Sequence, residues 1–153
     1  ETLYKPYHRA LRRLVDKALS QFGAVLLVDC HSMPSVGLTR DEPPRPDVVI
    51  GDRYGISCAA VVSRLVETTL AGRAHSVTRN KPYAGGFITE HYGNPLHGAH
   101  AIQIEVNRAI YMDEDTRARK PGLARLTSDF AVLAEALAAL PLRDLGAFTA
   151  AAE

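Results

Sequence analysis

A run of apolar residues ends abruptly in polar ones early in this chain. Residues 25–28 are Val-Leu-Leu-Val, and Asp29, Cys30, His31 and Ser32 follow directly. Such a run predicts a buried strand of an α/β sheet, ending here at Asp29. Because ligands of open α/β sheets lie beyond the carboxyl ends of the strands, His31 stands where a metal ligand or catalytic base is expected. The alternative is a histidine that caps the strand end through hydrogen bonds.

Helical and strand patterns alternate along the rest of the chain. Apolar residues recur at helical spacing before Gly23, which supplies a natural C-terminal stop. We expect helices at about 2–22, 59–70 and 123–140, and strands at 24–29, 48–50, 76–79 and 101–107. Alternation of this kind predicts one α/β domain over residues 1–145, followed by a frayed tail at 146–153.

Two stretches lack such a pattern. Residues 32–48 contain four prolines and predict a long loop, a feature that is often functional. Residues 81–100 mix glycines with aromatic residues and three histidines, and they predict a loop that is too polar for the core.

Composition narrows the function classes. The formal net charge of +1 gives no electrostatic case for nucleic acid or a membrane as partner. No apolar run approaches the roughly 20 residues of a membrane span, and no secretory signal is visible. Cys30 and Cys58 lack C-x-x-C spacing, which favours reduced, buried thiols in a cytoplasmic protein. The chain begins with Glu1 rather than methionine, and we expect any site that needs upstream residues to be incomplete.

Glu105 is the second candidate for chemistry. It lies in the alternating segment 101–107, with Gln103 and Asn107 on the same face of the strand. A solvated polar face is the common explanation of such alternation. If the face instead lines a cleft, Glu105 is a candidate general base.

Other polar residues are weaker candidates. Arg79 precedes the glycine pair Gly85-Gly86, which suits carboxylate binding, although a plain turn with a solvated arginine is the alternative. The spacing of His91, His97 and His100 matches no familiar zinc motif. His8 and His75 are expected to be structural.

Six segments then stand in order along most of the chain: ETLYKPYH (1–8), LVDCHSMPS (27–35), IGDR (50–53), NKPYAGG (80–86), HYG (91–93) and QIEVNRAIYM (103–112). Together they resemble the N-formylglutamate amidohydrolase (N-formylglutamate deformylase) family. The resemblance implies a three-layer α/β/α fold with a mixed, mostly parallel sheet, zinc-carboxypeptidase-like (phosphorylase/hydrolase-like). It also implies a metal-dependent amidase that removes formate from N-formyl-L-glutamate, a small acidic N-acyl amino acid, in histidine degradation.

The resemblance implies roles for individual residues. His31 looks like a zinc ligand, and Glu105 looks like the carboxylate that activates the metal-bound water. Four further residues fall in segments expected to face the substrate, whose two carboxylates suit arginine partners. These are Arg79, Asn80, Tyr83 and Arg108.

The family's early Pro-His-Ser-Gly segment and its other zinc ligands are expected upstream of Glu1. Because catalytic zinc normally takes three protein ligands, we expect these residues alone to bind zinc weakly or not at all and to show little activity. The alternatives are a related zinc-dependent acyl-amino-acid deacylase or carboxypeptidase-like enzyme, and a non-catalytic α/β binding domain. The sequence does not indicate an oligomeric state.

Overall fold

In the described part of the chain, four segments rich in branched apolar residues form one mixed sheet. The computed structural model describes residues 2–37 and 44–146. The strand order is β1-β4-β2-β3, with bounds Val25–Met33 (β1), Ala99–Asn107 (β4), Val48–Gly51 (β2) and Val77–Arg79 (β3). β1 is parallel to β4 and β2 is parallel to β3, whereas β2 runs antiparallel to β4. The predicted mixed, mostly parallel sheet is therefore confirmed.

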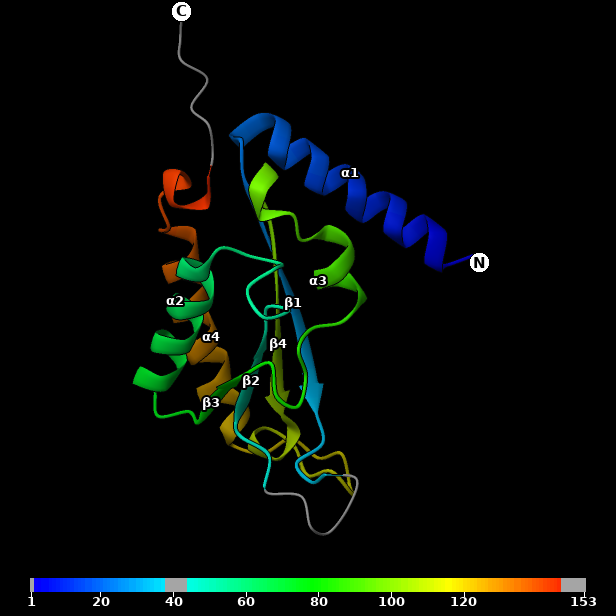
Figure 1. Ribbon diagram of the computed structural model, residues 1–153. Helices are drawn as coiled ribbons and strands as arrows, with labels where there is room; N and C mark the ends of the chain where they lie inside the picture. Colours follow the sequence, from blue (N-terminus) through cyan, green and yellow to red (C-terminus); the bar gives the residue numbers. More distant parts are fainter. Residues whose placement is uncertain (1, 38–43, 147–153) are drawn as a thin grey trace, which may run out of the picture.

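Helices cover both faces of this sheet (Figure 1). α1 (Tyr4–Phe22) and the short α3 (Phe87–Tyr92) lie on one face. α2 (Ala60–Gly72) and α4 (Gly122–Ala138) lie on the other. Within the residues that the model describes, three 3-10 turns complete the elements: η1 (Pro95–His97), η2 (Arg108–Ile110) and η3 (Leu142–Leu145). This arrangement confirms the three-layer α/β/α fold.

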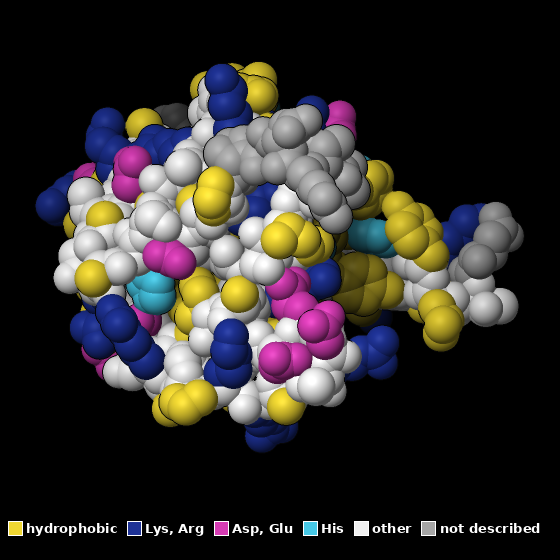
Figure 2. Space-filling view, turned by 90° about the horizontal axis from the view of Figure 1, so that it is seen from below, with side chains coloured by type: hydrophobic (Ala, Val, Ile, Leu, Met, Phe, Trp, Pro, Cys, Tyr) yellow, Lys and Arg dark blue, Asp and Glu magenta, His cyan; other side chains and the backbone are white. Residues whose placement is uncertain are grey.

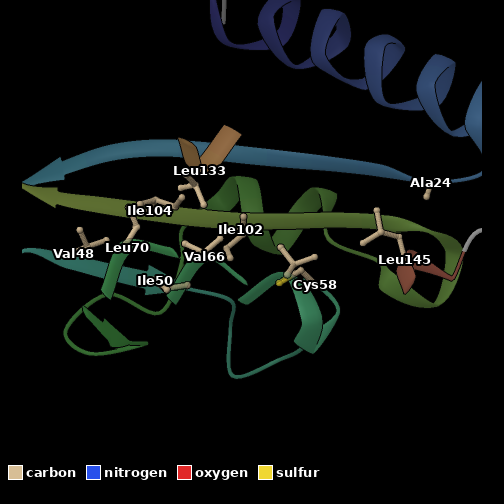
Figure 3. Packing of buried hydrophobic residues seen from close by; sticks show 11 residues of the cluster. Ala24, Val48, Ile50, Cys58, Val66, Leu70, Ile102, Ile104, Leu133 and Leu145 are labelled. Carbon is tan, nitrogen blue, oxygen red and sulfur yellow. The ribbon is translucent and has the colours of Figure 1, made fainter. Parts of the chain in front are cut away.

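The main core lies between the sheet and the pair α2 and α4. Ile102 and Ile104 of β4 pack there against Val66 of α2 and Leu133 of α4 (Figure 3). Each fully buried aliphatic side chain of this size stabilises the fold by about 1.5–3 kcal/mol. The core therefore fixes β4 as the central scaffold of the sheet.

The opposite face of the sheet is apolar only at one end. Val15 of α1 and Tyr92 of α3 pack on Ala101, with Val25 and Leu27 beside them. α1 ends where Gly23 adopts a left-handed conformation (φ 74°), as the sequence predicts, so that β1 begins two residues later. Farther along both strands this face carries polar side chains.

Three expectations about the strands are corrected by the structure. β1 continues to Met33, so His31 lies within the strand rather than beyond its end. Within the described residues β1 has a neighbour on one side only, and all of its residues except Met33 are partly or largely exposed rather than buried. In β4, by contrast, all nine residues are buried, so the polar face of Gln103 and Glu105 is not solvated.

Other expectations also change. The predicted loop at 81–100 contains α3 and η1, and Thr89 and Tyr92 within it are buried. Cys58 is buried as expected, whereas Cys30 is exposed. Residues 147–153 of the predicted tail lie outside the described residues, and Gly146 ends η3. Each helix in the described ranges is too short or too polar to cross a membrane.

Candidate active site

The polar end of the α1 side of the sheet is built by strand register. β1 and β4 are parallel, and their pairing places Asp29 beside Gln103 and His31 beside Glu105. Because side chains alternate between faces, these four project to the same side as Ala101. Two neighbouring strands thus bring a histidine, two carboxylates and an amide together.

His31 lies between the two carboxylates. Its Nε2 is 3.1 Å from Asp29 Oδ2, and its Nδ1 is 3.9 Å from Glu105 Oε1. About half of the His31 side chain is exposed (49%), so a ligand from solvent can reach it. The structure therefore brings the two residues predicted for catalysis into one place.

Glu105 is much less accessible. Its residue exposure is 7%, and its Oε1 accepts a hydrogen bond of 2.7 Å from Gln103 Nε2. Burial raises the pKa of Glu105 above its ordinary value, although the nearby His31 and the Gln103 hydrogen bond oppose this shift. A partly desolvated carboxylate of this kind is suited to accept a proton.

A glycine loop closes one side of the site. Gly86 N–H donates to Gln103 Oε1 at 2.7 Å. The loop crosses Gly51 of β2 so closely that a Cβ there would lie 2.5 Å from Gly85 N. Gly51 pairs with Gln103 in the sheet, so the close approach of two backbones positions the loop over the polar face.

A cavity of about 660 Å³ opens at His31 on this face, between α1 and α3. Tyr4, His8 and Phe87 line it together with Asp29 and His31. Figure 2 looks from below onto the carboxyl ends of β1 and β4 and shows the first turns of α1 projecting at one side, with hydrophobic side chains on them. The cavity therefore combines an aromatic wall with the polar end of the sheet.

Arg108 follows β4 directly and borders the site. Asn107 accepts a hydrogen bond from Ala109 N–H and so caps the turn η2 that carries Arg108. The Arg108 guanidinium donates to the Ser32 carbonyl oxygen at 3.2 Å. Its positive charge also acts on Glu105 and favours the ionised carboxylate. Of the four residues predicted to face the substrate, Arg108 is the one whose charge acts on Glu105.

Arg79 lies on the opposite side of the sheet. It pairs with Ile50 in register, and its Nη2 is 2.5 Å from Glu67 Oε2 of α2. Its Nε is buried and has no hydrogen-bond partner among the described residues. The structure thus brings Arg79 to α2 rather than to Glu105.

Asn80 and Tyr83 lie in the loop that follows β3. Asn80 Nδ2 donates to Asp52 at 2.7 Å, and Asn80 Oδ1 accepts from Asp52 N–H at 3.1 Å. Burial opposes ionisation of Asp52, but hydrogen bonds from Ser63 and Asn80 outweigh it and hold the pKa of Asp52 below its ordinary value. Tyr83 is half-buried, with the Arg45 guanidinium 5.6 Å from its ring centre. Substrate contacts of both residues stay predictions.

The polar residues fit a metal site only in part. Asp29 stands at Nε2 of His31 as an orienting carboxylate does for a metal-ligating histidine, which leaves Nδ1 on the side of Glu105. Within residues 2–37 and 44–146, however, no three His, Cys, Asp or Glu side chains are placed to hold a metal together. A catalytic zinc needs more donors than this part of the chain supplies.

The structure adds two residues, Gln103 and His8, to the site that the sequence predicts. Gln103 stood beside Glu105 in the alternating pattern, and that shared face was the signal for it. His8 was expected to be structural, and its Nδ1 is indeed 2.8 Å from Tyr92 Oη. Only the packing of α1 against α3 shows that His8 also lines the cavity at His31.

Comparisons with known proteins agree with this arrangement. The family model of N-formylglutamate amidohydrolase matches residues 1–112. N-formylglutamate deformylase of Pseudomonas putida is 36% identical over 115 residues, which are 74% of this chain and 43% of the relative. That of Pseudomonas aeruginosa is 35% identical over 140 residues, covering 90% of this chain and 52% of the relative. The crystal structure of N-formylglutamate amidohydrolase from Ralstonia eutropha JMP134 is similar at a TM-score of 0.83 and 37% identity, covering 88% of this chain and 50% of that one. The chain thus spans about half the length of these relatives.

Proposed function

Because the chain belongs to the N-formylglutamate amidohydrolase family, we propose that the protein hydrolyses the formamide C–N bond of N-formyl-L-glutamate. One water is consumed, and L-glutamate and formate are the products. The observation that carries the proposal is the buried carboxylate of Glu105 beside the accessible His31 at the mouth of a cavity. A cytoplasmic place in histidine degradation belongs to the same proposal.

Glu105 acts as the proton carrier. It takes a proton from the attacking water while the water oxygen bonds to the formyl carbon. When the tetrahedral intermediate collapses, the C–N bond breaks and Glu105 returns the proton to the leaving nitrogen. A carboxylate that is largely buried and lies beside the accessible His31 suits both transfers.

His31 is proposed as one ligand of a zinc ion. Asp29 orients the ring through Nε2, and the other donors come from outside the described residues. When bound, zinc would supply Lewis-acid polarisation of the formyl carbonyl.

Arg108 is proposed to bind a substrate carboxylate. Its guanidinium is held by the Ser32 carbonyl and lies near Glu105, and arginine binds carboxylates through two parallel hydrogen bonds. Arg79 is paired with Glu67 on the other face and is a weaker candidate for this role. Asn80 and Tyr83 lie in the loop between β3 and α3, and they are proposed to support this loop beside the substrate.

The test is release of the free amino acid, with formate or acetate as the second product, by the natural protein that carries this sequence, purified with bound zinc. N-formyl-L-glutamate is compared with N-formyl-L-glutamine and with N-acetyl-L-glutamate at equal concentrations. Preference for N-formyl-L-glutamate supports an enzyme that cleaves formamides and binds both carboxylates of this substrate. Preference for N-acetyl-L-glutamate supports a related deacylase, and release of no product from any of them supports a binding domain. Removal of zinc by a chelator should abolish activity, and added zinc should restore it.

A further inference from the structure

We propose that Gln103 is a positioning residue, which holds Glu105 in place and links it to the glycine loop Gly85–Gly86. The inference rests on the proposed function, since it concerns the carboxylate that carries the proton. Gln103 is 4% exposed and lies at the centre of the sheet. A buried amide costs free energy unless its polar atoms are paired, and both ends of this one are paired.

The orientation of the amide is fixed by its two partners. Gly86 N–H is a donor, so the atom 2.7 Å away is the amide oxygen of Gln103. The amide nitrogen therefore points the other way, where it donates to Glu105 Oε1 at 2.7 Å. If the amide were reversed, its NH2 group would face the Gly86 N–H, and two donors would meet. The Gly86 N–H therefore determines that the NH2 group of Gln103, and not its oxygen, faces the Glu105 carboxylate.

This contact distinguishes the two oxygens of Glu105. Oε1 receives the Gln103 hydrogen bond and lies 3.9 Å from His31 Nδ1. Oε2 accepts no hydrogen bond from the described residues. Gln103 therefore holds one oxygen and leaves Oε2 as the oxygen that exchanges a proton with water and the leaving nitrogen.

The same contact joins the loop to the catalytic group. Ala84 and Gly85 lie over Gly51, which pairs with Gln103, and Thr89 Oγ1 donates to the Gly86 carbonyl at 2.8 Å. The loop is therefore held from the sheet below and from α3 beside it. A substrate that contacts the loop acts on Gly86, and through Gln103 on the position of Glu105.

The test compares Gln103→Met, which keeps the length of the side chain and loses both hydrogen bonds, with Ile104→Val, which loosens β4 on its other face. In Gln103→Met we expect kcat for N-formyl-L-glutamate to fall about 10- to 100-fold, while KM stays near the wild-type value. Ile104→Val should leave both constants near wild type. A kcat in Gln103→Met equal to that of Ile104→Val overturns the positioning role.

A second measurement does not depend on activity. Amide hydrogen exchange at Gly86 should become about tenfold faster in Gln103→Met, because its acceptor is lost. Glu105→Leu does not touch Gly86, yet it should also speed this exchange, with no further increase in the double variant. Unchanged exchange in Glu105→Leu overturns the link to the loop.

If the wild-type protein releases no formate, the proposed function fails, and the exchange data still decide whether Gln103 joins Gly86 to Glu105.

Discussion

β1 and β4 are neighbours of equal length that supply the site from very different surroundings. Each has nine residues, and they run parallel in register. Every residue of β4 is buried, whereas β1 has one neighbouring strand within the described ranges and exposes Cys30 and His31. The pair thus places a group that benefits from desolvation, Glu105, directly beside a group that must be reached from outside, His31.

The difference explains how each strand tolerates polar residues. On β4 every buried polar side chain needs a partner, and Gln103 provides one for Glu105 while Gly86 provides one for Gln103. On β1 water can solvate Asp29 and His31, so these side chains do not need a hydrogen-bond partner within the protein. Substitutions on β4 should therefore have larger effects than matched substitutions on β1.

The largest effect is expected for Glu105→Gln. The amide has nearly the same shape but does not accept the proton, so kcat for formate release should fall about 10²- to 10⁴-fold. Asp29→Asn on β1 is the matched control, since it removes only an orienting carboxylate and should cost about 10- to 100-fold. Steady-state kinetics with circular dichroism as a check of folding measures both. A loss of less than tenfold in Glu105→Gln, or a larger loss in Asp29→Asn than in Glu105→Gln, would refute the role of Glu105.

The next prediction compares the packing of the two strands. Ile104→Ala in β4 should lower the free energy of unfolding by about 2–5 kcal/mol, because it leaves a cavity in the main core. Leu26→Ala in β1 removes the same number of carbons on the same face but from a half-buried place, so its cost should be about half as large. Urea unfolding measures both values. A cost for Leu26→Ala as large as that for Ile104→Ala would mean that β1 is covered.

The sequence predicts where the helices and strands lie better than it predicts how deeply each strand is buried. The apolar run 25–28 predicts a buried strand, yet β1 lies at the edge of the described sheet. The alternation around Glu105 suggested a solvated face, yet β4 is central, because β1 and β2 pair with it from distant parts of the chain. Periodicity reports which residues share a face, and this placed Gln103 with Glu105 correctly. What covers a face depends on long-range pairing, which a local pattern does not contain.

A smaller effect is expected at the two arginines. Arg108→Ala, just after β4, should raise KM for N-formyl-L-glutamate about 10- to 100-fold, the value of one charge-assisted contact with a carboxylate. Arg79→Ala on the α2 face should leave KM near wild type and change stability instead, since it breaks the pair with Glu67. The same assay with N-formyl-L-glutamine shows whether Arg108 binds the side-chain carboxylate. A larger rise of KM in Arg79→Ala would move the substrate contact to the other arginine.

The last prediction needs no substitution: chemical modification of the two cysteines tests whether the edge of β1 that has no neighbouring strand in the described residues is accessible. Cys30 is exposed on β1, whereas Cys58 is 1% exposed and burial raises its pKa to about 11. At pH 8 about one Cys58 thiol in a thousand is then ionised, and the thiolate is the reactive form. Burial and the Asp29 carboxylate raise the pKa of Cys30 as well, but its side chain is accessible to the reagent. Iodoacetamide should therefore modify Cys30 in the native protein and Cys58 only after denaturation, as read by mass spectrometry. If Cys30 is also protected, a further strand or a second copy covers β1, and Leu26→Ala should then cost nearly as much as Ile104→Ala. The two measurements together decide whether the accessible side of the site is a property of β1 itself.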